Sequence, residues 1–419
     1  MRISAKLIDA AVAALTEVMH FEHPADAVLS QFFRAQRVMG QRDRGFVAET
    51  VYAVLRRRRC LERRVGSDPV PRRLALAALL HLQGLSQRQL APAVSSEEAA
   101  WLAEQKAEPA ESLSLAERAD LPDWLAERLL QRMNAEELLE LARGLNQGAP
   151  LDVRVNPLKA TREEVLLKLN ADGIEGRACP YSPLAIRLKG KPALQRNPLY
   201  LTGAIEVQDE GSQLLAYLLA PKRGEMVVDF CAGAGGKTLL LGALMRSTGR
   251  LYAFDVAEKR LSRLRARVAR SGLSNVHPIC INSENDVRVK RLTEKIDRVL
   301  VDAPCSGLGT LRRNPDLKWR QTAEGVAELA RKQASILAGA ARLVKPKGRL
   351  VYATCSILPE ENEEIVIGFL DAHPQFKLAS AADVLKKQRI ELECGEVFRL
   401  TPHQHDTDGF YAVVLDRVA

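Results

Sequence analysis

The sequence predicts an α/β protein with a doubly wound, mostly parallel sheet in its C-terminal half. A small α/β segment and an all-helical N-terminal region are expected to precede that sheet. Three observations support this. Residues 1–140 carry apolar side chains at helical spacing, short strands begin near residue 147, and from about Gly224 β-branched runs alternate with helical stretches. The expected domains are therefore 1–140, 147–205 and 206–419.

Composition limits the class of protein. Of 419 residues, 47% are apolar and 27% charged, which excludes a disordered chain, a collagen and a small disulfide scaffold. The net charge is +9, which fits either a polyanionic partner or a merely basic soluble protein. No run approaches the roughly 18 apolar residues that span a bilayer. The seven cysteines are odd in number and form no C-x-x-C pair, so we expect a reducing cytoplasm and no metal site.

The helical prediction for the N-terminal region depends on three stretches with apolar residues three and four apart: 7–19, 46–65 and 72–85. Asp9 interrupts the first stretch, which therefore predicts an amphipathic helix rather than a signal peptide. Arg56–Arg59 begins the densest basic cluster of the chain. That cluster is equally consistent with a solvated helix face and with a footprint for RNA phosphates.

A further helical stretch is expected over 121–147, with Pro122 in its first turn. Next, LDVRV (151–155) predicts a strand. TREEVLLKLNADG predicts a helix capped by Thr161 and ended by Gly173. With the later runs AIRLKG and AIEVQDEGS, these elements make up the small α/β segment.

In the sheet domain, the expected strands are MVVDF, LYAFDV, DRVLVDAP, RLVYATCS and GFYAVVLDRV. The first strand enters a glycine-rich turn, CAGAGGKT, that leads into a helix, and the second strand ends at Asp255. A carboxylate at this spacing can accept hydrogen bonds from ribose hydroxyls. A P-loop is disfavoured because Cys231 occupies its first glycine position. The segment favours S-adenosylmethionine, while a dinucleotide or a purely structural turn remains open.

Two cysteines follow strands directly. Asp302 and Cys305 lie just beyond one predicted strand, and Cys355 lies just beyond the next, with one crossover helix between. A right-handed crossover makes such strands parallel, and we expect them to be neighbours. Both thiols then lie over the edge of the sheet where α/β proteins bind ligands. The other cysteines are expected to serve packing.

The segments DFCAGAGGKT, DAPCSGLGTLRRNPDLKW and YATCSILPEENEEIV resemble the signature segments of RNA (cytosine-5) methyltransferases of the Sun/Fmu/NOP2 family. The resemblance covers about 147–419. RDRGFVAETVYAVLRRRR is similar, more loosely, to a NusB-like RNA-binding domain. The resemblance implies a Rossmann-like methyltransferase domain, S-adenosylmethionine as cofactor, and RNA as partner, with 16S ribosomal RNA as the expected substrate; a monomer is expected.

The resemblance also implies the site. Cys355 is the expected nucleophile toward cytosine C6, Cys305 the residue that helps product release, and Asp302 a partner of cytosine N3. The expected cofactor-binding residues are Cys231, Ala232, Gly233, Ala234, Gly235, Gly236, Lys237, Asp255, Asn282 and Asp302. Asn282 stands where the family usually carries an aspartate near adenine. Arg312 and Arg313 are expected to meet RNA phosphates.

Two other functions remain open from the residues alone. A dinucleotide-dependent oxidoreductase explains the glycine turn and Asp255 but leaves both strand-end cysteines without a role. A non-catalytic RNA-binding assembly factor keeps the fold without methyl transfer.

Overall fold

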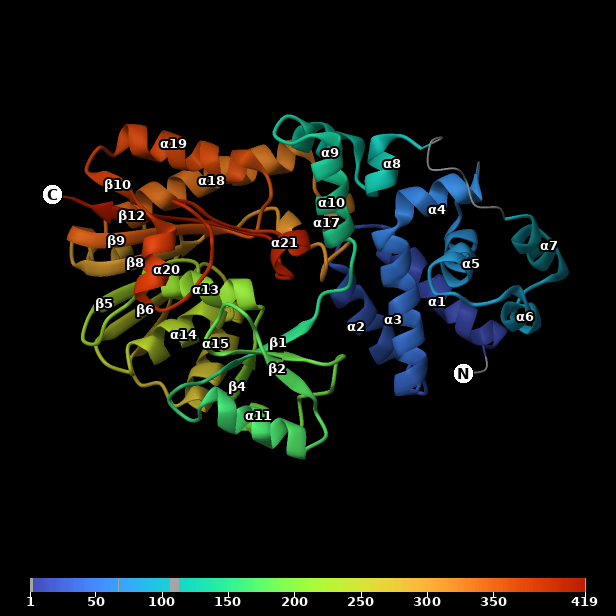
Figure 1. Ribbon diagram of the computed structural model, residues 1–419, viewed down its shortest axis with the longest axis horizontal. Coiled ribbons are helices and arrows are strands. Elements are labelled where there is room, and N and C mark those ends of the chain that lie inside the picture. Colours follow the sequence, from blue (N-terminus) through green and yellow to red (C-terminus); the bar gives the residue numbers. More distant parts are fainter. Residues whose placement is uncertain (1–2, 67, 106–112, 419) are drawn as a thin grey trace. The chain divides into compact units, whose positions relative to one another are not determined.

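The computed structural model describes residues 3–66, 68–105 and 113–418 (Figure 1). The chain forms two compact units. The helical unit comprises Met1–Gly148 and Thr310–Ala323, and the sheet unit comprises Ala149–Gly309 and Glu324–Ala419. The sequence placed residues 310–323 in the sheet domain, whereas the structure builds them into the helical unit.

The described residues of the helical unit form helices, as their apolar spacing predicts. Ser4 caps the first helix by accepting a hydrogen bond from Leu7 N. The buried faces of α1, α3 and α5 share one core. The bounds are α1 Ala5–Val18, α2 Ala25–Ala35, α3 Gln41–Arg56, α4 Arg58–Val65, α5 Pro71–His81, α6 Gln87–Leu90, η1 Ala91–Ala93, α7 Ser96–Glu104, α8 Leu115–Ala119, α9 Asp123–Leu130, α10 Ala135–Leu145 and α17 Leu317–Arg320.

The single helical stretch expected over 121–147 is wrong in detail, because the structure divides it into α9 and α10. Asn134 makes the break: its side chain accepts hydrogen bonds from the backbone N–H groups of Glu136 and Glu137 and so starts a new helix. Pro122 is the N-cap residue of α9 rather than part of its first turn.

The arginine cluster at 56–59 stays partly exposed, with 41% of the Arg57 side chain accessible, and its contact with RNA phosphates stays a prediction. Its side chains bind acceptors within the helical unit. The contacts are Arg56 to the carbonyl of Arg312, Arg57 to Asp120 at 2.8 Å, Arg58 to Glu62 at 2.6 Å and Arg59 to Asp123 at 2.9 Å.

Lys318 anchors the segment 310–323 in the helical unit. Its ammonium is fully buried and donates to the carbonyls of Arg56 and Asp120, each at 2.7 Å, and to Asn146 Oδ1 at 2.8 Å. The neighbouring Trp319 packs against the core of the same unit. A buried ammonium is stable only when its protons find acceptors, and here each proton has one.

We expect Lys318→Met to lower the free energy of unfolding by about 3 kcal/mol, because three buried oxygens lose their donor and Asp120 loses a buried counter-charge. Urea unfolding followed by circular dichroism measures the loss. Lys6→Met, on the exposed face of α1, is the matched control. A Lys318 variant as stable as the control would contradict this anchoring role.

The small sheet of the sheet unit has the strand order β2-β3-β1-β4, and its neighbouring strands are antiparallel. The helix predicted to begin at Thr161 follows β1 and precedes β2 in the sequence. Thr161 caps it through a reciprocal capping box with Glu164. The bounds are β1 Leu151–Val155, α11 Arg162–Ala171, β2 Gly176–Ala178, β3 Ala185–Leu188, α12 Pro198–Leu201 and β4 Ile205–Val207.

The large sheet has the order β10-β12-β9-β8-β5-β6-β7, with β11 paired to β12. Strands β9, β8, β5, β6 and β7 run parallel to one another. Strand β12 runs antiparallel to β9. The bounds are α13 Glu210–Leu219, β5 Met226–Asp229, α14 Gly236–Leu244, β6 Arg250–Asp255, α15 Glu258–Ser271, β7 Val276–Cys280, α16 Val287–Lys290, β8 Ile296–Asp302, η3 Leu308–Thr310, α18 Ala323–Ala341, β9 Val344–Thr354, η4 Pro359–Glu361, α19 Glu363–Ala372, β10 Phe376–Ala379, α20 Ala381–Lys387, β11 Phe398–Leu400, α21 Pro402–His405 and β12 Phe410–Arg417.

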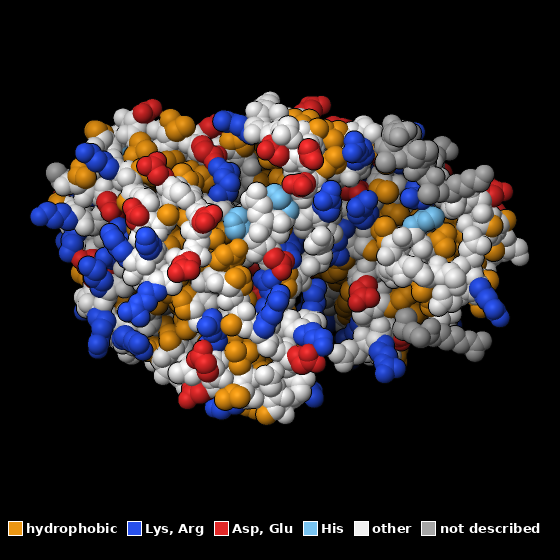
Figure 2. Space-filling model, viewed as in Figure 1, with side chains coloured by type: hydrophobic (Ala, Val, Ile, Leu, Met, Phe, Trp, Pro, Cys, Tyr) orange, Lys and Arg blue, Asp and Glu red, His pale blue; other side chains and the backbone are white. Residues whose placement is uncertain are grey.

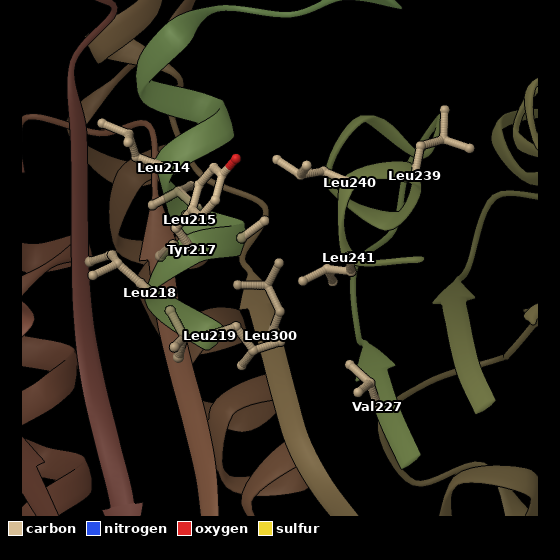
Figure 3. Close-up of a cluster of buried hydrophobic side chains, with 14 of the residues drawn as sticks. Leu214, Leu215, Tyr217, Leu218, Leu219, Val227, Leu239, Leu240, Leu241 and Leu300 are labelled. Carbon is tan, nitrogen blue, oxygen red and sulfur yellow. The ribbon is translucent and has the colours of Figure 1, made fainter. Parts of the chain in front are cut away.

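Helices cover both faces of the large sheet, as a continuous apolar strand pattern predicts. Alternate residues of one strand enter different cores: Val227 packs with α13 and α14, whereas Val228 packs with α18 and α19. Figure 3 shows the first core, where leucines of α13 lie beside Leu300 and leucines of α14 lie above Val227. Across the described parts of the chain, no helix is long and apolar enough to cross a membrane.

Candidate active site

The glycine-rich turn lies between β5 and α14, at the carboxyl edge of the sheet. Gly233 and Gly235 adopt left-handed φ angles of +56° and +87°. A Cβ on Gly235 would lie 2.1 Å from Leu264 Cδ1, so a side chain there would clash, whereas a Cβ on Gly233 would meet no atom within 4 Å. The turn therefore needs glycine for close packing on one side and leaves open space on the other.

The strands beside this turn end in polar groups. Asp255 closes β6, and its carboxylate accepts hydrogen bonds from the backbone N–H groups of Gly233 at 2.9 Å and Ala257 at 2.7 Å. Asn282 follows β7 and is exposed; its backbone N–H donates to Asp286. Carboxylate and amide acceptors at these strand ends match the hydroxyls and amino group of an adenosine, so the residues fit S-adenosylmethionine.

Lys237 in the first turn of α14 is not a solvated lysine. Its ammonium pairs with Asp302 Oδ2 at 2.8 Å, and its side chain is only 12% exposed. The nearby carboxylate of Asp302 favours the charged ammonium and, against the effect of burial, raises the pKa of Lys237. Cys355 also contributes to the raised pKa of Lys237, so the glycine turn lies near the cysteine pair.

The two strand-end cysteines meet, as the crossover argument predicts. Strands β8 and β9 are parallel neighbours, and Cys305 Sγ lies 3.4 Å from Cys355 Sγ. Hydrogen bonding to Cys355, together with burial, raises the pKa of Cys305 well above its ordinary value. Both side chains are half-buried rather than sealed in the core.

Three predicted site residues lie in less open positions. Cys231 is half-buried, and burial raises the pKa of its thiol, which fits packing rather than chemistry. Arg312 is buried, with 3% of its surface exposed, and Arg313 is half-buried. Their contact with RNA phosphates stays a prediction. No group of three or more potential metal ligands occurs in the part of the chain that the structure describes.

Residues that the sequence did not single out support the glycine turn from behind. Arg267 donates to the carbonyl of Ala234 at 2.7 Å, and Arg154, from the small sheet, donates to the carbonyl of Gly236 at 2.5 Å. Glu206 pairs with Arg267 at 2.9 Å. The carbonyls of Ala234 and Gly236 are thus each held by a guanidinium group. No local motif marks these contacts, because Arg267 is 33 residues from Ala234 in the sequence and Arg154 is 82 residues from Gly236.

We expect Arg267→Ala to weaken S-adenosylmethionine binding by about tenfold, since the turn loses a charge-assisted hydrogen bond. Isothermal titration calorimetry measures the Kd. Arg270→Ala is the matched control because Arg270 also pairs with Glu206 but, among the described residues, donates no hydrogen bond to the glycine turn. Equal losses of affinity in both variants would contradict the proposed support of the turn.

Asp229, the last residue of β5, should make stability depend on pH. It is buried and accepts a hydrogen bond from Thr238 Oγ1 at 2.7 Å, and burial raises its pKa to about 7. The folded protein therefore binds a proton on the Asp229 carboxyl group more tightly than the unfolded chain does. The stability that this proton adds to the folded state is complete below the ordinary pKa of about 4 and is lost as the pH rises through 7.

The urea concentration at the unfolding midpoint should fall between pH 5 and pH 8 in the wild type. We expect Asp229→Asn to make this fall smaller. Asp371→Asn, exposed on α19, should leave the decline unchanged. An Asp229 variant with the wild-type slope would show that this carboxyl group does not titrate abnormally.

A parallel sheet of this order, with a glycine turn after its first strand and acidic groups at the following strand ends, defines a Rossmann-like S-adenosylmethionine-dependent methyltransferase. Comparisons agree. The family model for 16S rRNA methyltransferase RsmB/F matches residues 216–416, and the model for the RsmF/B-like, ferredoxin-like domain matches residues 121–195.

The probable ribosomal RNA small subunit methyltransferase B of Synechocystis sp. is 34% identical over 408 residues, which cover 90% of this chain and 91% of that relative. The crystal structure of PH0851 has a TM-score of 0.80 and 30% identity, and the match covers 100% of both chains. A methyltransferase homolog from Pyrococcus horikoshii has a TM-score of 0.63 and 29% identity, covering 74% of this chain and 100% of that one.

The chain belongs to the RsmB/F family of 16S rRNA methyltransferases. It is an S-adenosylmethionine-dependent RNA methyltransferase, which confirms the expected class and cofactor and excludes the oxidoreductase alternative.

Proposed function

We propose that the protein transfers a methyl group to C5 of a cytosine in 16S rRNA, through a transient bond between Cys355 Sγ and cytosine C6. The observation that carries this proposal is the pair of thiols 3.4 Å apart at the ends of neighbouring strands, beside the ion pair of Lys237 and Asp302. A methyltransferase acting on a nitrogen or on a hydroxyl group needs no such pair.

The chemistry explains why a thiolate is useful. Cytosine C5 is a weak nucleophile, and addition of a thiolate to C6 makes C5 enamine-like. S-adenosylmethionine supplies the electrophilic methyl group that C5 receives. A solvent water would then accept the C5 proton, and the electron pair of the broken C5–H bond would form the C5=C6 double bond as the Cys355 thiolate leaves C6, which restores the aromatic ring. Cysteine suits both steps because it adds readily and also leaves readily.

Electrostatics favour Cys355 over Cys305 as the nucleophile. Hydrogen bonding to Cys355 and burial raise the pKa of Cys305, which favours its neutral thiol form. Cys355 is the thiol of the pair that interacts with the Lys237 ammonium. This difference supports the roles that the family resemblance implies for the two cysteines.

The remaining site residues take supporting roles in this proposal. Asp302 is 28% exposed at the end of β8 and is the residue proposed to supply a proton or a hydrogen bond to cytosine N3. Asp255 would hold the ribose of the cofactor, Asn282 the adenine, and the turn from Cys231 to Lys237 the remainder. The target base must be unpaired or flipped out of its helix to reach the thiol.

RNA binding is proposed to involve Arg313 and the helical unit, which resembles a NusB-like domain. Figure 2 shows Lys and Arg side chains spread over the viewed face and interspersed with Asp and Glu. Binding should therefore weaken with salt, with log K falling about 0.7 per phosphate contact on single strands.

The seven cysteines are all free, which supports a reducing cytoplasm.

The test uses the full chain, unmethylated 16S rRNA and S-adenosylmethionine with a tritiated methyl group. Transfer to RNA followed by nucleoside digestion should give labelled 5-methylcytidine. A labelled nucleoside other than 5-methylcytidine would overturn the cytosine C5 assignment. RNA binding without any transfer would overturn 16S rRNA as the substrate of the proposed reaction.

A further inference from the structure

Glu361 is a fully buried acidic residue that joins the two cysteine loops. Its Oε1 accepts hydrogen bonds from the backbone N–H of Ser306 at 2.8 Å and from Gln333 Nε2 at 2.9 Å. Its Oε2 accepts from the hydroxyl groups of Ser306 and Ser356. Each serine directly follows one of the two site cysteines. A single carboxylate therefore holds both loops by the residue next to the thiol.

Other contacts fix the same two loops. The backbone N–H of Gly309 donates to the carbonyl of Cys355 at 2.8 Å, and a Cβ on Gly309 would lie only 2.8 Å from that carbonyl. Gln333, from the crossover helix α18, donates to the carbonyl of Pro304 at 2.9 Å. Tyr352 donates its hydroxyl proton to the backbone carbonyl of Glu361 at 2.6 Å. The loop after β8 and the loop after β9 thus form one connected hydrogen-bonded unit.

A buried carboxylate is unfavourable unless donors compensate for its lost hydration. Four donors do so here, which matches the number of lone-pair positions that a carboxylate offers. Because the side chain is 0% exposed, it does not meet substrate or cofactor. Any effect of Glu361 on catalysis must therefore act through the groups that it binds, above all Ser306 and Ser356. Its negative charge also adds to the effects that raise the pKa of Cys305.

We propose that Glu361 is a positioning residue for methyl transfer: by binding Ser306 and Ser356 together, it sets the separation of the Cys305 and Cys355 thiols. Its catalytic consequence rests on the proposed function above. The geometric consequence does not, because the distance between two thiols is measurable without any reaction on RNA.

The first test measures that distance chemically. Full-length protein is treated with dibromobimane, which bridges only neighbouring thiols, and the Cys305–Cys355 linked peptide is quantified by mass spectrometry. We expect Glu361→Gln to slow bridging at least about tenfold, because an amide N–H₂ replaces one acceptor oxygen and faces donor groups. Glu364→Gln, exposed on α19, is the matched control and should bridge at the wild-type rate.

The second test measures catalysis. We expect Glu361→Gln to lower kcat about 10²-fold, as a displacement of about 1 Å can do, with the KM for S-adenosylmethionine within twofold of wild type. Ser306→Ala and Ser356→Ala remove one link each and should give intermediate losses in both assays. Circular dichroism shows whether Glu361→Gln is folded. If it is not, the two serine variants test the proposal in its place.

The two proposals fail in different ways. Wild-type bridging and wild-type kcat in a folded Glu361 variant, or in both serine variants, would overturn the positioning role. Slowed bridging in an enzyme that makes no 5-methylcytidine would support the positioning role and overturn the proposed reaction.

Discussion

Cys355→Ala should abolish methyl transfer, lowering the rate by about 10⁴-fold or more, as the loss of a covalent nucleophile typically does. Cytosine C5 then has no route to the enamine-like state. S-adenosylmethionine binding should persist, because the glycine turn, Asp255 and Asn282 are untouched. Tritium transfer to 16S rRNA measures the rate, and calorimetry measures cofactor affinity.

Cys394→Ala is the matched control for Cys355→Ala, since Cys394 is also a half-buried cysteine of the sheet unit. It should keep wild-type transfer. A Cys355 variant that retained even a tenth of the activity would overturn the assignment of Cys355 as the nucleophile.

Cys305→Ala should instead trap the enzyme on its RNA. Cys355 still adds to cytosine, but the thiolate that must leave C6 loses the hydrogen bond from the neighbouring thiol. The covalent complex should accumulate as a slowly migrating band of protein and RNA on denaturing gels, with turnover reduced by about 10²-fold. Wild-type enzyme should show little of this band.

The double variant Cys305→Ala/Cys355→Ala is the control for the trapped complex, because it lacks the thiol that forms the bond. It should give no band. If the band appears with Cys355→Ala and not with Cys305→Ala, the two cysteines have exchanged roles, and Cys305 is the nucleophile.

Local patterns predicted the parts of the site that depend on strand order. The strands ending at Asp302 and Thr354 were visible as β-branched runs, and a single crossover helix between them required a parallel pair. The meeting of Cys305 and Cys355 follows from that geometry, and the structure confirms it at 3.4 Å. The partnership of Lys237 with Asp302 was not predicted, although both residues had been named.

The supporting residues were beyond prediction because their partners are far away in the sequence. Glu361 lies 55 residues from Ser306, and Arg154 lies 82 residues from Gly236. Neither pair has a spacing rule, since each depends on how separate elements pack. The break between α9 and α10 is different: Asn134 followed by Glu137 is a recognisable start signal for a helix, which a continuous apolar period concealed.

The division of the helical unit into two separate pieces of chain has a consequence for biosynthesis. Its last piece, Thr310–Ala323, leaves the ribosome more than 160 residues after Gly148. Until then, the site that will receive Trp319 and the Lys318 ammonium stays open. The N-terminal helices should therefore pass through a partly assembled state during translation and complete their core only when most of the sheet unit has been synthesised.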